Sequence, residues 1–123
     1  MRLFQTISGL CFIVFGSFCL NAQTVTLDNI TTFENQRVTL CEKVIGTYQS
    51  KSESGVSYLN FGAPYPNHSF TVVIFKKDLE HFDYDPVAFL KNKTVCVSGT
   101  IVFYKNKPQI IASNPDQIVV KEN

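Results

Sequence analysis

The sequence has no surplus of basic residues. Eleven lysines and arginines stand against ten aspartates and glutamates, and beyond position 2 the single arginine is Arg37. Proteins that bind nucleic acids usually carry a basic surplus, because neutralised phosphates supply much of their affinity. We therefore expect any binding of nucleic acid by this chain to be weak and sensitive to salt.

Motifs of known catalytic centres are also missing. The sequence has no CxxC, no HExxH and no glycine-rich phosphate loop, and its two histidines, His68 and His81, belong to no recognisable Ser/His/Asp pattern. A nuclease centre needs clustered acids and an arginine that clamps phosphate, whereas Arg37 stands alone. The sequence predicts a binding protein rather than an enzyme, with no cofactor and no metal site.

One segment leaves a catalytic alternative open. Five polar side chains lie within eight residues: Asp78, Glu80, His81, Asp83 and Asp85. Such groups can ligate a divalent cation, which would make the chain a small metal-dependent enzyme. The spacing does not match an EF-hand loop, and aspartates near helix N-termini favour a solvated capping segment instead.

The first 22 residues read as a secretory signal. Arg2 supplies a positive start, an apolar stretch runs from Leu10 to Leu20, and the small residue Ala22 suits a cleavage site before Gln23. The stretch is too short to span a bilayer. We expect bacterial export to the periplasm or the medium, a mature domain over 23–123 with no stable membrane insertion, and a net charge of zero once Arg2 is removed.

Two cysteines remain in the mature chain, Cys41 and Cys96. In an oxidising compartment a disulfide between them is the default expectation, with two free thiols as the alternative. A bond across so long a loop would reinforce a domain of only about 100 residues, which buries a modest fraction of its surface.

The apolar residues recur mostly every second position, which predicts strands. The expected strands are 37–48, 56–61, 70–75, 94–104 and a last one over 109–112 that continues through 117–120. Glu42 interrupts the alternation of the first strand and Gly46 lies near its end, which predicts a bend or bulge there. Asp85–Pro86 is typical of a helix start, and Asp78 is a further candidate cap.

Three strands, a short helix and two strands give the topology of the oligonucleotide/oligosaccharide-binding (OB) barrel. We therefore predict an all-β, five-stranded Greek-key barrel with a short helix between strands three and four. Its first and fourth strands are antiparallel neighbours. Cys41 and Cys96 have the opposite parity to the apolar residues of these strands, so both should point outward on the same side, where a disulfide can form.

Five segments carry a family resemblance: 39–44 (TLCEKV), 58–67 (YLNFGAPYPN), 70–75 (FTVVIF), 95–101 (VCVSGTI) and 107–111 (KPQII). In them the chain resembles the nucleic-acid-binding OB domain of the anticodon-binding and helicase-associated type. It is most similar to the version that accompanies secreted bacterial nucleases or stands alone behind a signal sequence. The strongest match is Gly99-Thr100-Ile101, a short basic turn and the return Pro108-Gln109-Ile110. The resemblance implies binding to single-stranded DNA or RNA.

In OB barrels the ligand lies over strands two and three, between the loops joining strands one to two and four to five. Aromatic side chains there stack on bases, and basic ones follow the backbone. The candidate residues are Lys51, Tyr58, Tyr65, His68, Tyr104, Lys105 and Lys107. The alternative interpretation makes them ordinary cross-strand partners and solubilising charges. Net neutrality favours a second hypothesis, a domain that binds an envelope protein, peptide or glycan.

Overall fold

The computed structural model describes residues 23–121. The predicted signal peptide over 1–22 lies outside the described residues, so it stays a prediction. Over 23–121, no helix is long and apolar enough to cross a membrane.

The described chain is mostly strand, with four short helical turns. The strands are β1 Gln23–Val25, β2 Arg37–Gln49, β3 Ser57–Phe61, β4 Phe70–Ile74, β5 Thr94–Thr100, β6 Val102–Tyr104, β7 Lys107–Ile111 and β8 Ile118–Val120. The helical turns are η3 Ile30–Phe33, α1 Lys76–Leu79, α2 Pro86–Leu90 and η4 Pro115–Gln117. The five expected strands are thus present as more pieces, because the predicted strand 94–104 breaks at Ile101 and the last strand breaks at η4.

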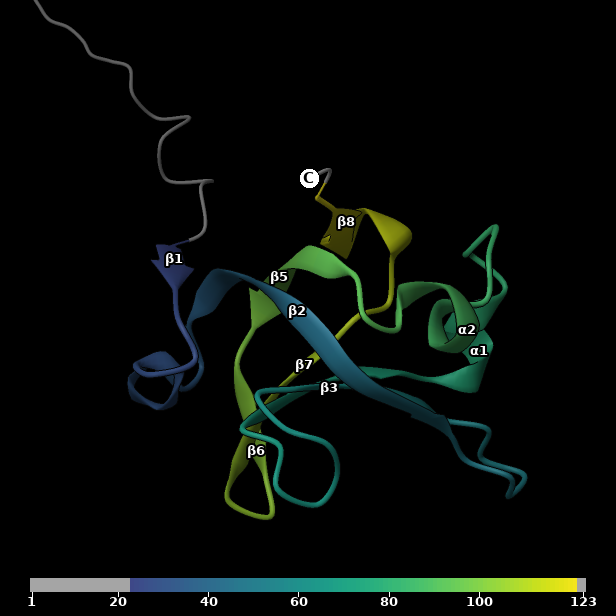
Figure 1. The fold of residues 1–123 in the computed structure, drawn as a ribbon, viewed down its shortest axis with the longest axis horizontal. Coiled ribbons are helices and arrows are strands. Elements are labelled where there is room, and N and C mark those ends of the chain that lie inside the picture. Colours follow the sequence, from purple (N-terminus) through teal and green to yellow (C-terminus); the bar gives the residue numbers. More distant parts are fainter. Residues whose placement is uncertain (1–22, 122–123) are drawn as a thin grey trace, which may run out of the picture.

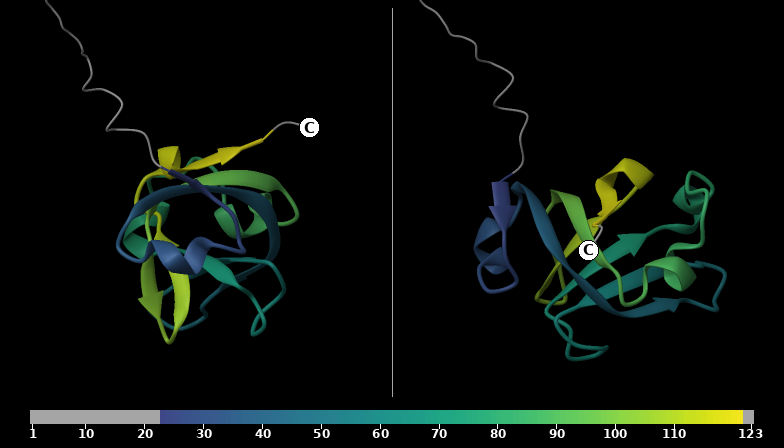
Figure 2. Two further views of the ribbon diagram at one scale, coloured as in Figure 1. Left: turned by 90° about the vertical axis from the view of Figure 1, so that its left-hand side faces the viewer. Right: turned by 45° about the horizontal axis from the view of Figure 1, so that its top comes forward.

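The strands form one sheet in the order β6-β7-β4-β3-β2-β5-β8, with β1 paired beside β2. The pairings β4–β7 and β1–β2 are parallel, and the others are antiparallel. Figures 1 and 2 show that the sheet curls around a single core, with α1 and α2 on one side of it. The predicted pairing of the first and fourth strands is confirmed as the β2–β5 ladder.

The long strand β2 bends at a bulge. Its ladder with β3 pairs Val44 with Phe61 and then jumps to Gly46 with Asn60, so Ile45 is the extra residue. A bulge bends its strand and increases the local twist, which lets one strand serve two parts of a curled sheet. The predicted bend is confirmed, but it follows Val44 and is not at Glu42.

Cys41 and Cys96 are registered partners in the β2–β5 ladder, and their sulfur atoms lie 2.05 Å apart, at disulfide distance. The cysteines are 55 residues apart in the sequence. Closing a loop of that length stabilises the fold by about 4 kcal/mol in the chain-entropy model. The bond therefore ties β2 to the second half of the chain.

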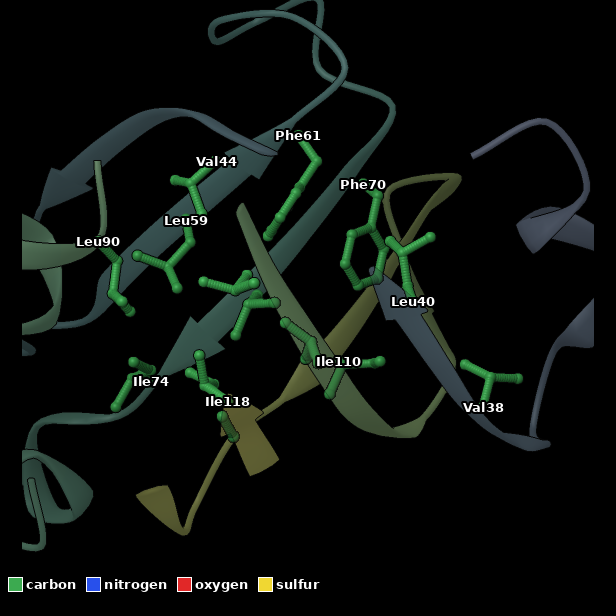
Figure 3. Packing of buried hydrophobic residues seen from close by; sticks show 14 of the residues in the cluster. Val38, Leu40, Val44, Leu59, Phe61, Phe70, Ile74, Leu90, Ile110 and Ile118 are labelled. Atoms are coloured by element: carbon green, nitrogen blue, oxygen red, sulfur yellow. The ribbon is translucent and has the colours of Figure 1, made fainter. Parts of the chain in front are cut away.

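The core is filled mainly by side chains of one parity from β1 to β5, β7 and β8, whereas Phe103 of β6 is only partly buried against it. Figure 3 labels ten residues of this core. Two residues from helical turns complete it: Ile30 of η3 and Leu90 of α2 are fully buried. All five residues of β4 are buried, as its apolar character on both faces predicts.

Of the two capping residues predicted from the sequence, Asp85 caps a helix and Asp78 does not. The Asp85 carboxylate accepts hydrogen bonds from the backbone N–H groups of Val87 (3.1 Å) and Ala88 (3.4 Å), and Pro86 opens α2. Asp78 does not cap a helix, which corrects the prediction. The N-cap of α1 is Phe75, and Asp78 lies inside the helix with a buried side chain.

Gly99 marks a close crossing between β5 and β7. A Cβ at this position would lie 2.5 Å from Cγ2 of Ile110 and 3.2 Å from Nε2 of Gln117. Because Ile110 is fully buried, it has no room to move away. The crossing therefore depends on the missing side chain.

We predict that Gly99→Ala lowers the free energy of unfolding by about 1–3 kcal/mol, the usual cost of overpacking. The matched control is Gly46→Ala, since a Cβ there meets its nearest atom, Cα of Pro64, at an ordinary 3.8 Å. Urea denaturation followed by circular dichroism measures both. Equal stabilities for the two variants would contradict this account of the crossing.

Candidate functional site

The candidate site is the outer face, which we define as the surface formed by the outward side chains of β3, β4, β6, β7 and the second half of β2. Their ladder neighbours Leu59, Val72 and Ile110 point into the core. Two rows of paired residues cross this face. The first is Tyr48–Tyr58–Val73–Ile111, and the second is Gly46–Asn60–Thr71–Gln109–Val102.

The first row is an apolar platform with two tyrosines at one end. The rings of Tyr48 and Tyr58 are stacked, with centroids 6.3 Å apart and planes at 19°. Tyr48 is 52% exposed. At the other end of the row, Ile111 also presents its side chain to solvent. Exposed rings on a sheet are the usual stacking partners of nucleic-acid bases.

The second row is polar and covered. Asn60 and Thr71 point outward, yet they are only 5% and 6% exposed. The hydroxyl of Thr71 lies 2.8 Å from Oδ1 of Asn60 and 3.0 Å from the carbonyl oxygen of Leu59. The β3–β4 loop, residues 62–69, passes over this row, because Cα of Pro64 lies only 3.8 Å from the Cβ position of Gly46.

Lys107 holds this loop in place. Its ammonium group donates hydrogen bonds to the carbonyl oxygens of Pro66 at 2.6 Å and His68 at 2.9 Å. The loop in turn presents an exposed aromatic pair. Tyr65 is 76% exposed, and its ring stacks on that of His68 at a centroid distance of 5.7 Å. Lys107 is therefore a clamp for the loop rather than a free loop charge.

The β6–β7 turn supplies a second aromatic and basic pair beside this loop. Tyr104 is exposed, and Nζ of Lys105 lies 5.4 Å from the centre of its ring. Lys105 and Asn106 adopt positive φ angles of 51° and 66°, which suits a tight two-residue hairpin turn. Tyr104 is the ladder partner of Lys107, so the turn and the clamped loop meet on the outer face.

The outer face has no carboxylates. Neither residues 54–77 nor residues 86–115 contain an aspartate or glutamate, and 44–49 of β2 also lack them. The acids lie elsewhere, chiefly before position 54 and between 78 and 85. The near balance of 11 basic and 10 acidic residues in the whole chain thus hides a face on which no carboxylate repels a phosphate, while three lysines stand at its edges.

The seven predicted residues are divided between two places. Tyr65, His68, Tyr104, Lys105 and Lys107 gather around the clamped loop. Lys51 lies in the β2–β3 loop, at the opposite end of β3, so the structure does not bring it together with these five residues. Tyr58 lies between, on the platform. The sequence prediction missed Tyr48 and Ile111. Tyr48 could have been found from its pairing with Tyr58, but that pairing follows only once the position of the bulge in β2 is known.

The acidic segment 78–85 does not gather a metal site. Across the described residues, no three side chains of His, Cys, Asp or Glu come together as a set able to hold a metal ion. Nδ1 of His81 lies 3.2 Å from the carbonyl oxygen of Ser113 and 3.8 Å from Oδ1 of Asp78, and Asp85 caps α2. The segment is explained by capping and local contacts.

The pKa of the His68 imidazole is shifted downward. Burial lowers its pKa below the usual 6.5, and the positive charge of Lys107 lowers it further. Its Nδ1 is buried and has no hydrogen-bond partner. The unfolded chain therefore binds a proton at a pH where folded His68 stays neutral, so the free energy of unfolding falls as the pH drops below about 6.5.

We predict that Lys107→Gln raises the pKa of His68 towards 6.5, because it removes one of the two causes of the shift. The matched control is Lys105→Gln, since Lys105 does not contribute to that shift. NMR titration of the imidazole signals measures both. A His68 pKa that is the same in wild type and Lys107→Gln would rule out the contact between the ammonium group and the loop.

Comparison with solved structures supports the OB-type fold. A chain in the crystal structure of yeast Stn1 and Ten1 superposes on this protein with a TM-score of 0.59 and 12% sequence identity, over 84% of this chain and 64% of that chain. The chain thus spans less than two thirds of its neighbour's length. At this identity the likeness shows the fold alone, and the predicted mostly-β, OB-like class is confirmed. No protein-family model and no curated protein matches the sequence.

Proposed function

We propose that this chain is a non-catalytic OB-type module that binds single-stranded DNA or RNA on its outer face. The observation that carries the proposal is the combination on one carboxylate-free surface of a stacked tyrosine pair, Tyr48 and Tyr58, with further exposed rings at Tyr65 and Tyr104. Bases stack on such rings at about 1–3 kcal/mol each, with little dependence on sequence.

The lysines set the expected strength of binding. Lys105 and Lys51 are free to contact phosphates at the two ends of the face, whereas Lys107 is engaged with the loop. Few phosphate contacts mean weak binding, which salt weakens further. Stacking therefore supplies most of the affinity.

We also propose that the chain forms a closed five-stranded barrel, that it is of the anticodon-binding and helicase-associated OB type, and that it is exported. β5 and β6, separated only by Ile101, act as one strand that pairs with β2 at one end and β7 at the other, which would close a five-stranded barrel. The anticodon-binding and helicase-associated type, in its exported bacterial form, fits the motifs quoted above. Export to the periplasm or medium is supported by the cysteine pair, since disulfides persist in oxidising compartments.

The test is fluorescence anisotropy with labelled oligothymidine and oligouridine of about 15 nucleotides, a length that covers an OB site. We predict binding at low salt that weakens at about 150 mM salt. Tyr48→Ala and Tyr104→Ala should each raise Kd by about 5- to 150-fold, because each removes one stacking partner.

The matched control is Phe89→Ala, which removes an exposed aromatic ring from α2, away from the outer face. Its Kd should equal that of the wild type. No binding to either oligomer at low salt would remove the proposal. In that case the neutral face would favour the alternative partner, an envelope protein, peptide or glycan, which a pulldown from envelope extract would identify.

A further inference from the structure

A polar cleft opens beside the outer face, where β5 and β7 diverge. It has a volume of about 640 Å³. Its walls come from the start of β2, the end of β5, the end of β7 and the residues around η4, and they include Arg37, Ser98, Thr100, Ile111, Asn114 and Asp116. We call it the Arg37 cleft.

The cleft exists because the ladders on either side of it stop short. β8 pairs with β5 only from Val95 to Val97, and β7 pairs with β6 only from Val102 onward. Between these two ladders, the side-chain amide of Gln117 makes the hydrogen bonds that a neighbouring strand would otherwise make. Its Nε2 donates to the carbonyl oxygens of Ser98 at 3.0 Å and Ile111 at 3.2 Å, which fixes the floor of the cleft.

The cleft continues the platform of the outer face. Ile111 ends the row that begins with Tyr48 and Tyr58, and the same residue lines the cleft. A nucleic-acid strand that passes the exposed Ile111 on the outer face therefore reaches the cleft that Arg37 lines.

Arg37 suits a phosphate at this point. Its side chain is exposed, and among the described residues it forms no ion pair. The guanidinium group presents a planar fork of donors that matches phosphate oxygens. The hydroxyl of Thr100 and the amide of Asn114 add donors nearby, whereas the Ser98 hydroxyl is hydrogen-bonded to that of Thr39 at 2.8 Å. Asp116 is the one carboxylate in the lining.

We infer that the Arg37 cleft receives a phosphodiester group of the bound strand where the strand leaves the outer face past Ile111. This inference rests on the proposed function. It also gives the chain's single mature arginine a role as a phosphate contact, while Asp116 opposes that contact and weakens binding.

Two substitutions, one that removes a positive charge and one that removes a negative charge, test the inference by anisotropy with the same oligothymidine. Arg37→Gln should raise Kd by roughly two- to tenfold, the range expected for losing one hydrogen bond of ordinary net strength on an exposed surface. It should also make the slope of log Kobs against log[salt] shallower by about 0.7, as expected for one phosphate of a single strand. Asp116→Asn should lower Kd, because it removes the repelling charge and keeps the shape.

The matched control is Lys91→Gln, which removes an exposed cation at the end of α2 and should change neither Kd nor the slope. Thermal unfolding should be unchanged in all three variants, since none of the three side chains is buried or ion-paired in the described structure.

The two proposals fail in different ways. If the wild type binds and Tyr48→Ala weakens binding, but Arg37→Gln and Asp116→Asn both match the wild type, the cleft does not receive the strand and the outer face remains the site. If the wild type does not bind, both proposals are overturned.

Discussion

The structure depends on one strand being shared. β2 pairs with β1 and β5 along its first half and with β3 along its second half, and the bulge at Ile45 turns it from one part of the sheet to the other. Cys41 and Cys96 fasten the same strand to β5. Because β2 pairs with strands in both parts of the sheet, the bulge sets which of its side chains after Val44 lie in the core and which face outward.

The outer face follows from that arrangement. After the bulge, Gly46 and Tyr48 point outward beside Asn60 and Tyr58. Cα of Pro64 lies 3.8 Å from the Cβ position of Gly46, so the β3–β4 loop covers the polar row, and Lys107 holds the loop there. In the first row Tyr48 and Ile111 stay exposed while Val73 between them is buried, and the loop presents Tyr65 stacked on His68. A polar, hydrogen-bonded layer thus lies under the loop, while the rings that can stack on bases stay in solvent.

Much of the fold could be read from the sequence, because period-two alternation reports which face of a strand is buried. That signal predicted β2 and β3, while an apolar run predicted β4 and Asp85–Pro86 predicted the start of α2. The order of the elements, which matches an OB barrel, predicted the β2–β5 pairing on which the cysteine prediction rested. It did not give the break at Ile101 or the place of the bulge, because both depend on contacts distant in sequence. Gly99 and Ile110 meet only when β5 and β7 cross. Asp78 was misjudged because a capping residue and a buried helix residue look alike in sequence.

The site was harder to predict than the fold for the same reason. Tyr65, His68, Tyr104 and the two lysines of the β6–β7 turn could be chosen as candidates because they are aromatic or basic. Only the folded chain shows that the Lys107 ammonium group is hydrogen-bonded to two carbonyl oxygens of the β3–β4 loop. The Arg37 cleft arises because the β5–β8 ladder stops at Val97 and the β6–β7 ladder begins only at Val102. Short-range patterns in the sequence do not predict where such ladders end. Arg37 looked isolated in the sequence and lies next to the platform in space.

The central proposal is that single-stranded DNA or RNA binds across the outer face. The most direct measurement is an amide chemical-shift titration of the isotopically labelled protein with oligothymidine. The account predicts that the largest shifts follow the first row through β3, β4 and β7, continue into the 62–69 loop and the Arg37 cleft, and leave α2 unchanged. Shifts confined to α1, α2 or β8 would contradict it.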